Sequence, residues 1–270
     1  MHLGVNVPNF GPGTDPGLLR DWARVVEGLG YDLLMLSDHV AVTPDVAVRY
    51  PEPFYEPFTA LSWLAGVTNT IRLGTTVLIV PYRHPLLTAR MAGNLQRLSG
   101  GRLVLGVGVG WARQEFEALG VPYARRGRIT DEHLAAVQDA WFEEADLPRV
   151  PLWVGGHSGA ALRRAAQFGD AWHPLRLPLE RMAEVLSGHD LPGFAPRIAF
   201  RLTEAPVEDP ERPAGVGTLD QVLADLHRLR DLGAATTVLD PYHGDPDETL
   251  RPERAWRDLA EVAAHWKAAP

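Results

Sequence analysis

Short apolar segments alternate with longer segments of helical periodicity along the sequence, and this alternation limits the folds that the chain can adopt. The short segments are Leu3–Val7, Leu33–Leu36, Arg72–Val80, Leu103–Val107, Leu152–Val154, Ala171–His173, Ile198–Leu202 and Thr236–Leu239. They are rich in Val, Leu and Ile, and continuous apolar runs are typical of strands that are buried on both faces of a parallel sheet. Eight predicted strands separated by predicted helices favour an α/β fold.

Glycines at the helix-to-strand junctions narrow this class further. Gly30, Gly169 and Gly233 each follow a helical segment and precede a predicted strand. A glycine just past a helix adopts a left-handed backbone at little cost and ends the helix. The repeated junction predicts a (β/α)8 TIM-type barrel, formed by residues 1–270 as a single domain. An open doubly wound sheet is the structural alternative.

Composition excludes several classes of protein. The chain has 26 Lys and Arg against 34 Asp and Glu, a net charge of −8 and no long basic run, so we expect neither nucleic acid nor a membrane as a partner. The absence of cysteine excludes disulfides, thiolate metal sites and a cysteine nucleophile. No segment reaches the roughly 20 apolar residues of a membrane span and no signal peptide is evident, so a cytoplasmic protein is expected.

The loop after the fifth predicted strand reads Gly155, Gly156, His157, Ser158, Gly159. Its glycines allow a bound group to approach the backbone closely, and Ser158 can cap the helix that follows. The N–H groups at such a helix end suit an anion, most often phosphate. An ordinary tight turn also favours Gly and Ser, so the local sequence leaves both interpretations open.

Gly106 and Gly108 alternate along the end of the fourth predicted strand. Alternate glycines remove side chains from one face of a strand, which leaves room for a flat group. Close packing of the strand against a helix would explain the same two residues. The local pattern does not separate these two interpretations.

Asp38 and His39 follow the second predicted strand, at the end of the barrel where catalytic residues are expected. Histidine is the side chain most easily poised to exchange a proton near neutral pH. The pair is therefore a candidate acid–base site, and a helix cap or loop anchor is the alternative.

Histidines after other strands raise a second class of enzyme. His157, His173 and Asp240 match the outline of a metal-dependent barrel hydrolase. That class also needs a His-x-His pair on the first strand, where this chain has Gly4–Val7, and the fourth strand supplies neither lysine nor carboxylate. No metal is predicted, and the hydrolase stays a distant alternative.

Several motifs in combination resemble one known family, the luciferase-like superfamily of flavin- and deazaflavin-dependent oxidoreductases. The resemblance is specific over residues 1–180, looser beyond them, and nearest to the branch that uses coenzyme F420. It rests on Ser37–Val40, Ile71–Val77, Arg83–Pro85, Leu98–Leu103, Leu105–Trp111, Glu115–Gly120, Trp153–Arg164 and Gly169–Pro174.

The resemblance implies a cofactor held at the ends of the first four strands. It implies that Gly155–Gly159 hold the cofactor phosphate and that Gly106 and Gly108 lie near its ring. It also implies a non-prolyl cis peptide at Thr76–Val77 behind the ring, which makes both residues candidate cofactor contacts. By the same resemblance, His39 is the candidate acid–base group, and Asp38 orients it or contacts the cofactor.

Two features depart from the family pattern. Trp111 stands where dehydrogenases for sugar phosphates have a glutamate, and the segment between the fourth helix of the barrel and the fifth strand, Trp141–Val150, is short. The resemblance nevertheless implies an oxidoreductase that transfers a hydride between coenzyme F420 and a small organic substrate, with a homodimer as a possible assembly. An FMN-dependent monooxygenase and a non-catalytic flavin- or deazaflavin-binding protein are the alternatives within the same fold.

Overall fold

The computed structural model describes residues 1–143 and 148–268, and its main feature is a sheet of eight parallel strands. The strands lie in the order β6-β5-β4-β3-β2-β1-β10-β7, so neighbours in the sheet are consecutive barrel strands along the chain, except that the first strand, β1, pairs with the last, β10. Their bounds are β1 His2–Asn6, β2 Leu33–Leu36, β3 Arg72–Ile79, β4 Leu103–Gly108, β5 Leu152–Gly155, β6 Ala171–His173, β7 Arg197–Ala199 and β10 Thr236–Asp240. The strand order does not reverse as it does in a doubly wound sheet, which excludes that alternative.

Two parallel bridges bring the outer strands of this order together. Trp172 of β6 pairs with Phe194, and Leu175 pairs with Arg197 of β7. The sheet is therefore a nearly closed barrel, and the prediction of a (β/α)8 fold is confirmed.

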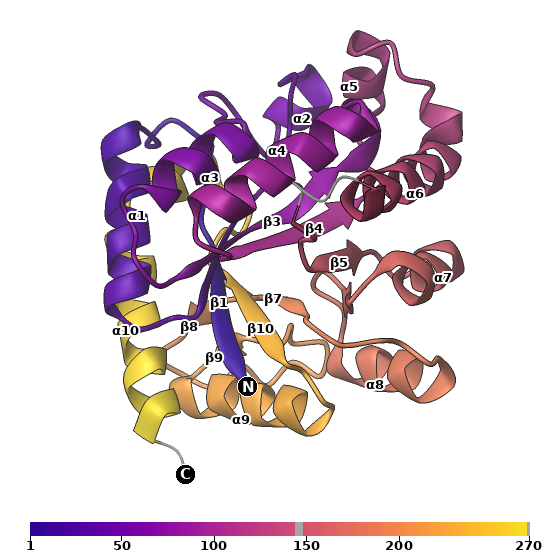
Figure 1. Cartoon of the computed structure of the whole chain (residues 1–270). Helices are drawn as coiled ribbons and strands as arrows, with labels where there is room; N and C mark the ends of the chain where they lie inside the picture. The colour runs from indigo at the N-terminus through magenta and orange to yellow at the C-terminus, as the bar shows by residue number, and fades with distance from the viewer. Residues whose placement is uncertain (144–147, 269–270) are drawn as a thin grey trace.

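Helices form a ring around the strands (Figure 1). They are α1 Pro16–Gly28, α2 Pro44–Ala47, α3 Pro57–Ala65, α4 Pro85–Leu98, α5 Arg113–Ala118, α6 Arg126–Glu143, α7 Gly159–Phe168, α8 Leu179–Gly188, α9 Leu219–Asp231 and α10 Glu253–Ala268, with short 3-10 turns at Val80–Tyr82, Tyr123–Arg125 and Pro246–Leu250. Within the described ranges, no helix has both the length and the hydropathy needed to cross a membrane. α6 ends at Glu143 and β5 begins at Leu152, and residues 144–147 of the short segment between them lie outside the described residues.

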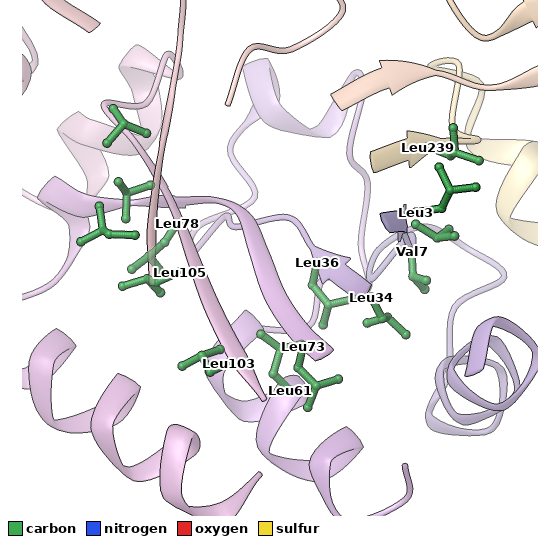
Figure 2. Packing of buried hydrophobic residues seen from close by; sticks show 14 of the residues in the cluster. Leu3, Val7, Leu34, Leu36, Leu61, Leu73, Leu78, Leu103, Leu105 and Leu239 are labelled. Carbon is green, nitrogen blue, oxygen red and sulfur yellow. The ribbon is translucent and has the colours of Figure 1, made fainter. Parts of the chain in front are cut away.

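Apolar side chains from the strands pack outward against the helices. Leu61 of α3 lies toward Leu73 of β3, and both are fully buried (Figure 2). A second cluster, which includes Met35 of β2, Val104 of β4 and Trp153 of β5, is also buried. Removal of this apolar surface from water is the main favourable term in folding the barrel.

The glycine junctions are confirmed at two positions and wrong at one. Gly30 and Gly233 have φ values of +76° and +91°, the left-handed conformation expected after a helix. Gly169 has a φ of −88°, which any residue adopts. Glycine is required there for a steric reason: a Cβ atom would lie 2.8 Å from the carbonyl oxygen of Ala165.

The seventh strand differs from its prediction. β7 ends at Ala199, whereas the sequence pattern continues to Leu202. Beyond Phe200 the chain leaves the barrel, and β8 Arg201–Leu202 pairs with β9 Val216–Gly217 in a separate two-stranded sheet. Ile198, Ala199, Phe200 and Leu202 keep the segment apolar across both strands, so the pattern cannot show where one ladder ends and the other begins.

Candidate active site at the carboxyl ends of the strands

Asp38 lies directly beyond β2 and is only 3% exposed. Arg83 donates to both of its oxygens at 2.8 Å, and the backbone N–H of Ile79 donates to Oδ2 at 2.8 Å. Arg83 also pairs with Glu56 at 2.8 Å, at the start of α3. A two-pronged contact of this kind fixes orientation as well as charge. Asp38 therefore ties the loop after β2 to the end of β3.

His39, the next residue, is held by a carboxylate from α5. Its Nδ1 lies 2.6 Å from Oε2 of Glu115, and both side chains are almost completely buried. Nε2 of His39 makes no hydrogen bond with any residue in the described ranges. Because Nδ1 is engaged by the carboxylate, Nε2 is the atom left to exchange a proton.

Glu115 gathers four hydrogen bonds on one buried carboxylate. Besides His39, it accepts from the backbone N–H groups of Val40 and Ala41 at 2.6 and 3.1 Å and from the Tyr82 hydroxyl at 2.8 Å. Burial alone would raise the pKa of Glu115, but His39 and the two amides hold it below its ordinary value. Burial and the neighbouring carboxylate raise the pKa of Tyr82, so its hydroxyl stays a donor.

Aromatic rings surround His39. Tyr50 stacks on its ring at a centroid distance of 5.4 Å, and Phe54 and Trp111 meet it edge-on at 5.5 and 5.7 Å. Phe10, beyond β1, contacts both Tyr50 and Phe54. Trp111 is 45% exposed, so this group of aromatic rings, the aromatic wall, reaches the protein surface at Trp111. These rings give His39 an apolar setting that limits the access of water.

β3 carries a bulge against β4. The peptide bond between Thr76 and Val77 is cis, at the position that the resemblance implied. The register with β4 shifts between Thr75 and Leu78. A Cβ atom on Gly106 would lie 2.1 Å from the Thr75 carbonyl oxygen, and one on Gly108 would lie 2.5 Å from a methyl group of Val77. β3 therefore fills the space beside both glycines, which neither interpretation from the sequence foresaw.

A polar network lies inside the barrel behind this bulge. The Thr76 hydroxyl lies 2.8 Å from Nε2 of His173, and Arg197 donates to the Thr76 carbonyl oxygen at 2.5 Å. Arg197 also pairs with Asp240 at 2.9 Å, and Asn6 donates to Asp240 at 3.0 Å. His173 and Asp240 are thus engaged in contacts between strands.

The structure does not bring the three candidate metal ligands together. His157 is exposed on its loop, whereas His173 and Asp240 are buried inside the barrel. Within residues 1–143 and 148–268, no group of three His, Asp or Glu side chains is arranged to hold a metal ion. The geometry therefore gives the hydrolase alternative no support.

The loop after β5 has the form expected of an anion site. Gly156 has a φ of +101°, and a Cβ atom there would lie 3.0 Å from that of Ala161. Ser158 is the N-cap of α7, and its hydroxyl accepts from the Ala161 N–H at 3.2 Å. Nε1 of Trp172, on β6, donates to the Gly156 carbonyl oxygen at 2.7 Å and so fixes the loop to the neighbouring strand. Gly159, like His157 and Ser158, is exposed, so the first N–H groups of α7 are open to a ligand.

These features fit a flat cofactor that carries a phosphate. The phosphate would meet the positive end of α7, and the apolar rings would cover the flat part. Oδ1 of Asn6, at the end of β1, is buried without a hydrogen-bond partner among the described residues, which leaves an acceptor for a ring N–H. Residues 155, 156, 158 and 159 would hold the phosphate.

Solved structures share this fold over almost the whole chain. A monooxygenase from Streptomyces bottropensis has a TM-score of 0.80 at 21% identity and covers 99% of both chains. An F420-dependent secondary alcohol dehydrogenase, solved with an F420-acetone adduct, has a TM-score of 0.74 at 15% identity and covers 97% of this chain and 98% of its own. The oxygenating part of 3,6-diketocamphane monooxygenase from Pseudomonas putida, solved with FMN, has a TM-score of 0.73 at 16% identity and covers 97% of both. At these identities the likeness shows the fold.

Curated relatives match the N-terminal part. An uncharacterized protein of Mycobacterium tuberculosis is 34% identical over 180 residues, which cover 56% of this chain and 62% of that protein. A phthiodiolone/phenolphthiodiolone dimycocerosates ketoreductase of the same species is 33% identical over 144 residues, 45% of this chain and 38% of the ketoreductase. The chain thus matches less than two thirds of the length of these relatives.

A family model places the chain more firmly. The model described as luciferase-like monooxygenase matches residues 1–188, more than half of the 270 residues, and includes the loops that carry Asp38, His39 and Ser158. The resemblance inferred from the motifs is confirmed. The chain belongs to the luciferase-like monooxygenase family.

Proposed function

We propose that this chain is an oxidoreductase that transfers a hydride between coenzyme F420 and a small organic substrate at the carboxyl ends of the barrel strands. The observation that carries the proposal is the buried His39–Glu115 pair inside an aromatic wall, with Nε2 of His39 unpartnered among the described residues. The likeness of the motifs to the F420-dependent branch, and an F420-dependent dehydrogenase among the structures of the same fold, support the choice of cofactor.

The residues of the chain have separate tasks in this proposal. The hydride chemistry is supplied by the cofactor when it is bound. Nε2 of His39 gives a proton to, or takes one from, the reacting oxygen of the substrate, and Glu115 holds the ring in the orientation needed. Asp38 fixes the loop through Arg83. The rings of Tyr50, Phe54 and Trp111 keep water away from the reacting atoms.

An FMN-dependent monooxygenase is the second candidate. The α7 N-terminus with its Ser158 cap would bind the phosphate of either cofactor. Monooxygenases are also among the structures with the same fold. The two candidates differ in the cofactor bound and in the consumption of oxygen.

Parallel titrations of the purified protein with oxidised F420 and with FMN test the proposal. We expect saturable F420 binding, followed by F420 fluorescence, with a dissociation constant of about 1 μM, and no saturation with FMN. Gly156→Asp should abolish binding by placing a carboxylate in the loop. Gly233→Asp is the matched control, because Gly233 also has a positive φ, +91°, and no atom within 4 Å of an added Cβ. Binding of FMN alone, with oxygen consumption, would favour the second candidate, and binding of neither would overturn both.

A further inference from the structure

A cavity of about 480 Å³ opens beyond the carboxyl ends of β6 and β10, beside Arg197 at the start of β7. Its walls include Arg49, Tyr50, Arg176, Arg197, Asp240 and Tyr242. Tyr50 forms part of this wall and also stacks on the His39 ring at 5.4 Å. The cavity and the candidate acid–base group therefore share one aromatic side chain.

Positive charge exceeds negative charge in this wall. Arg176 and Arg197 both contact Asp240, at 2.8 and 2.9 Å, and Arg49 also lines the cavity. The lining thus includes three arginines and one carboxylate, in a chain whose net charge is −8. A basic cavity in an acidic protein concentrates anions at that point.

Arg197 and Arg176 differ in how many of their guanidinium N–H groups have no acceptor in the described part of the chain. Arg197 is buried and spends its donors on Asp240 and on Thr76, so it supports the barrel. Arg176 has a side chain that is 34% exposed, and its Nη2 reaches Asp240 and the carbonyl oxygen of Tyr242. Nε and Nη1 of Arg176 make no hydrogen bond within the described part of the chain. Nε and Nη1 lie on different edges of the guanidinium, so each can donate a separate charge-assisted hydrogen bond to a carboxylate or phosphate.

The backbone holds Arg176 in an uncommon conformation. Its φ is +49°, the single positive value at a non-glycine position in the described ranges. Its N–H donates to the Arg197 carbonyl oxygen at 2.8 Å, next to the bridge between Leu175 and Arg197. The contacts that close the barrel thus also fix the side chain at the cavity.

We propose that this cavity binds the anionic group, a carboxylate or a phosphate, of the substrate that reacts beside His39. The proposal rests on the function proposed above, because it places the rest of the substrate against Tyr50 and toward Nε2 of His39. The loop expected to hold the cofactor phosphate follows β5 and contributes no residue to this wall. The two anion sites are therefore separate.

Calorimetric titration of the cofactor-free protein tests this directly. The probes are benzoate, phenyl phosphate and the neutral amide benzamide, which shares the ring of benzoate without its charge. We expect millimolar or tighter binding of at least one anion and none of benzamide, and the tighter anion identifies the group as carboxylate or phosphate. Arg176→Gly should weaken anion binding at least tenfold. Glycine accepts the positive φ, which offsets part of the loss of the Asp240 contact, and the unfolding temperature of the variant shows that it is folded.

Controls separate this site from general charge and from the proposed function. Arg24→Ala removes one exposed arginine on α1 and should leave anion binding unchanged. Arg49→Gln, on the cavity wall, should weaken it. Arg176→Gly should bind F420 as the wild type does.

The inference is overturned if neither anion binds at about 10 mM, or if Arg24→Ala weakens anion binding as much as Arg176→Gly does. Absence of F420 binding in the wild type and in every variant, with anion binding intact, would instead overturn the proposed function alone.

Discussion

At the scale of single residues, Glu115 decides how His39 is presented. Its carboxylate joins a histidine, two backbone amides and a phenol that come from other parts of the chain. A buried acceptor with four donors is costly to replace, because each donor then loses its partner without gaining water.

Glu115→Gln should lower the free energy of unfolding by about 1–3 kcal/mol. The amide keeps one acceptor oxygen but turns an N–H₂ group toward the donors on the other side. Urea unfolding followed by circular dichroism measures the change. Glu117→Gln makes the same substitution two residues away at an exposed position of α5 and should leave stability unchanged. Equal stability of the two variants would show that the Glu115 contacts contribute nothing.

At the scale of elements, substitutions of Ser158 can distinguish its role as the N-cap of α7 from the binding of a cofactor phosphate at the same helix end. Ser158→Asn and Ser158→Asp both keep a good capping side chain, so both should fold as stably as the wild type. Only the aspartate adds a negative charge where the cofactor phosphate is expected. We predict that Ser158→Asp weakens cofactor binding more than tenfold and that Ser158→Asn changes it only a few-fold. Fluorescence titration measures both constants, and equal constants would place the phosphate elsewhere.

The contact between β3 and β4 supplies a second prediction at this scale. A Cβ atom on Gly106 would lie 2.1 Å from the Thr75 carbonyl oxygen, so one of the two strands must move. Gly106→Ala should therefore destabilise the protein by about 1–3 kcal/mol, the usual effect of overpacking. Gly28→Ala, at the end of α1 with no atom within 4 Å of the new methyl group, should be neutral or slightly stabilising. Thermal unfolding distinguishes these outcomes, and an undisturbed Gly106→Ala would contradict the close approach.

At the scale of the whole molecule, His173 makes barrel stability depend on pH. Burial lowers the pKa of His173 from 6.5 to about 4. Between these values the unfolded chain binds a proton at His173 and the folded chain does not, so stability rises with pH. We predict that about 3 kcal/mol of stability is lost as the pH falls from 6.5 to 4 through this residue.

His173→Gln should remove this part of the pH dependence while it lowers stability at pH 7. Urea unfolding at several pH values gives the slope for each protein. His189→Gln, at the exposed end of α8, is the control and should keep the wild-type slope. A His173→Gln slope equal to that of the wild type would mean that the folded barrel accommodates a protonated His173.

Apolar periodicity and motifs predicted the eight barrel strands, their order and the family, because these signals are local, but they did not predict where β7 ends or that β8 pairs with β9. The sequence also placed Asp38, His39 and Ser158 in the loops beyond the carboxyl ends of strands, since each lies within three residues of one. Only the tertiary structure decided their partners. Glu115 lies 76 residues from His39, and nothing local in the sequence distinguishes it from its exposed neighbours Gln114 and Glu117.

The same limit applies across the barrel. Arg197 meets Thr76 at a separation of 121 residues, and Asn6 meets Asp240 at 234. Such contacts exist because closure of the sheet brings strands from both halves of the chain around one interior, and a one-residue change of register would turn each side chain to the opposite face. The cavity with its surplus of arginine arises in the same way: its walls are separate loops that meet only once the barrel is closed.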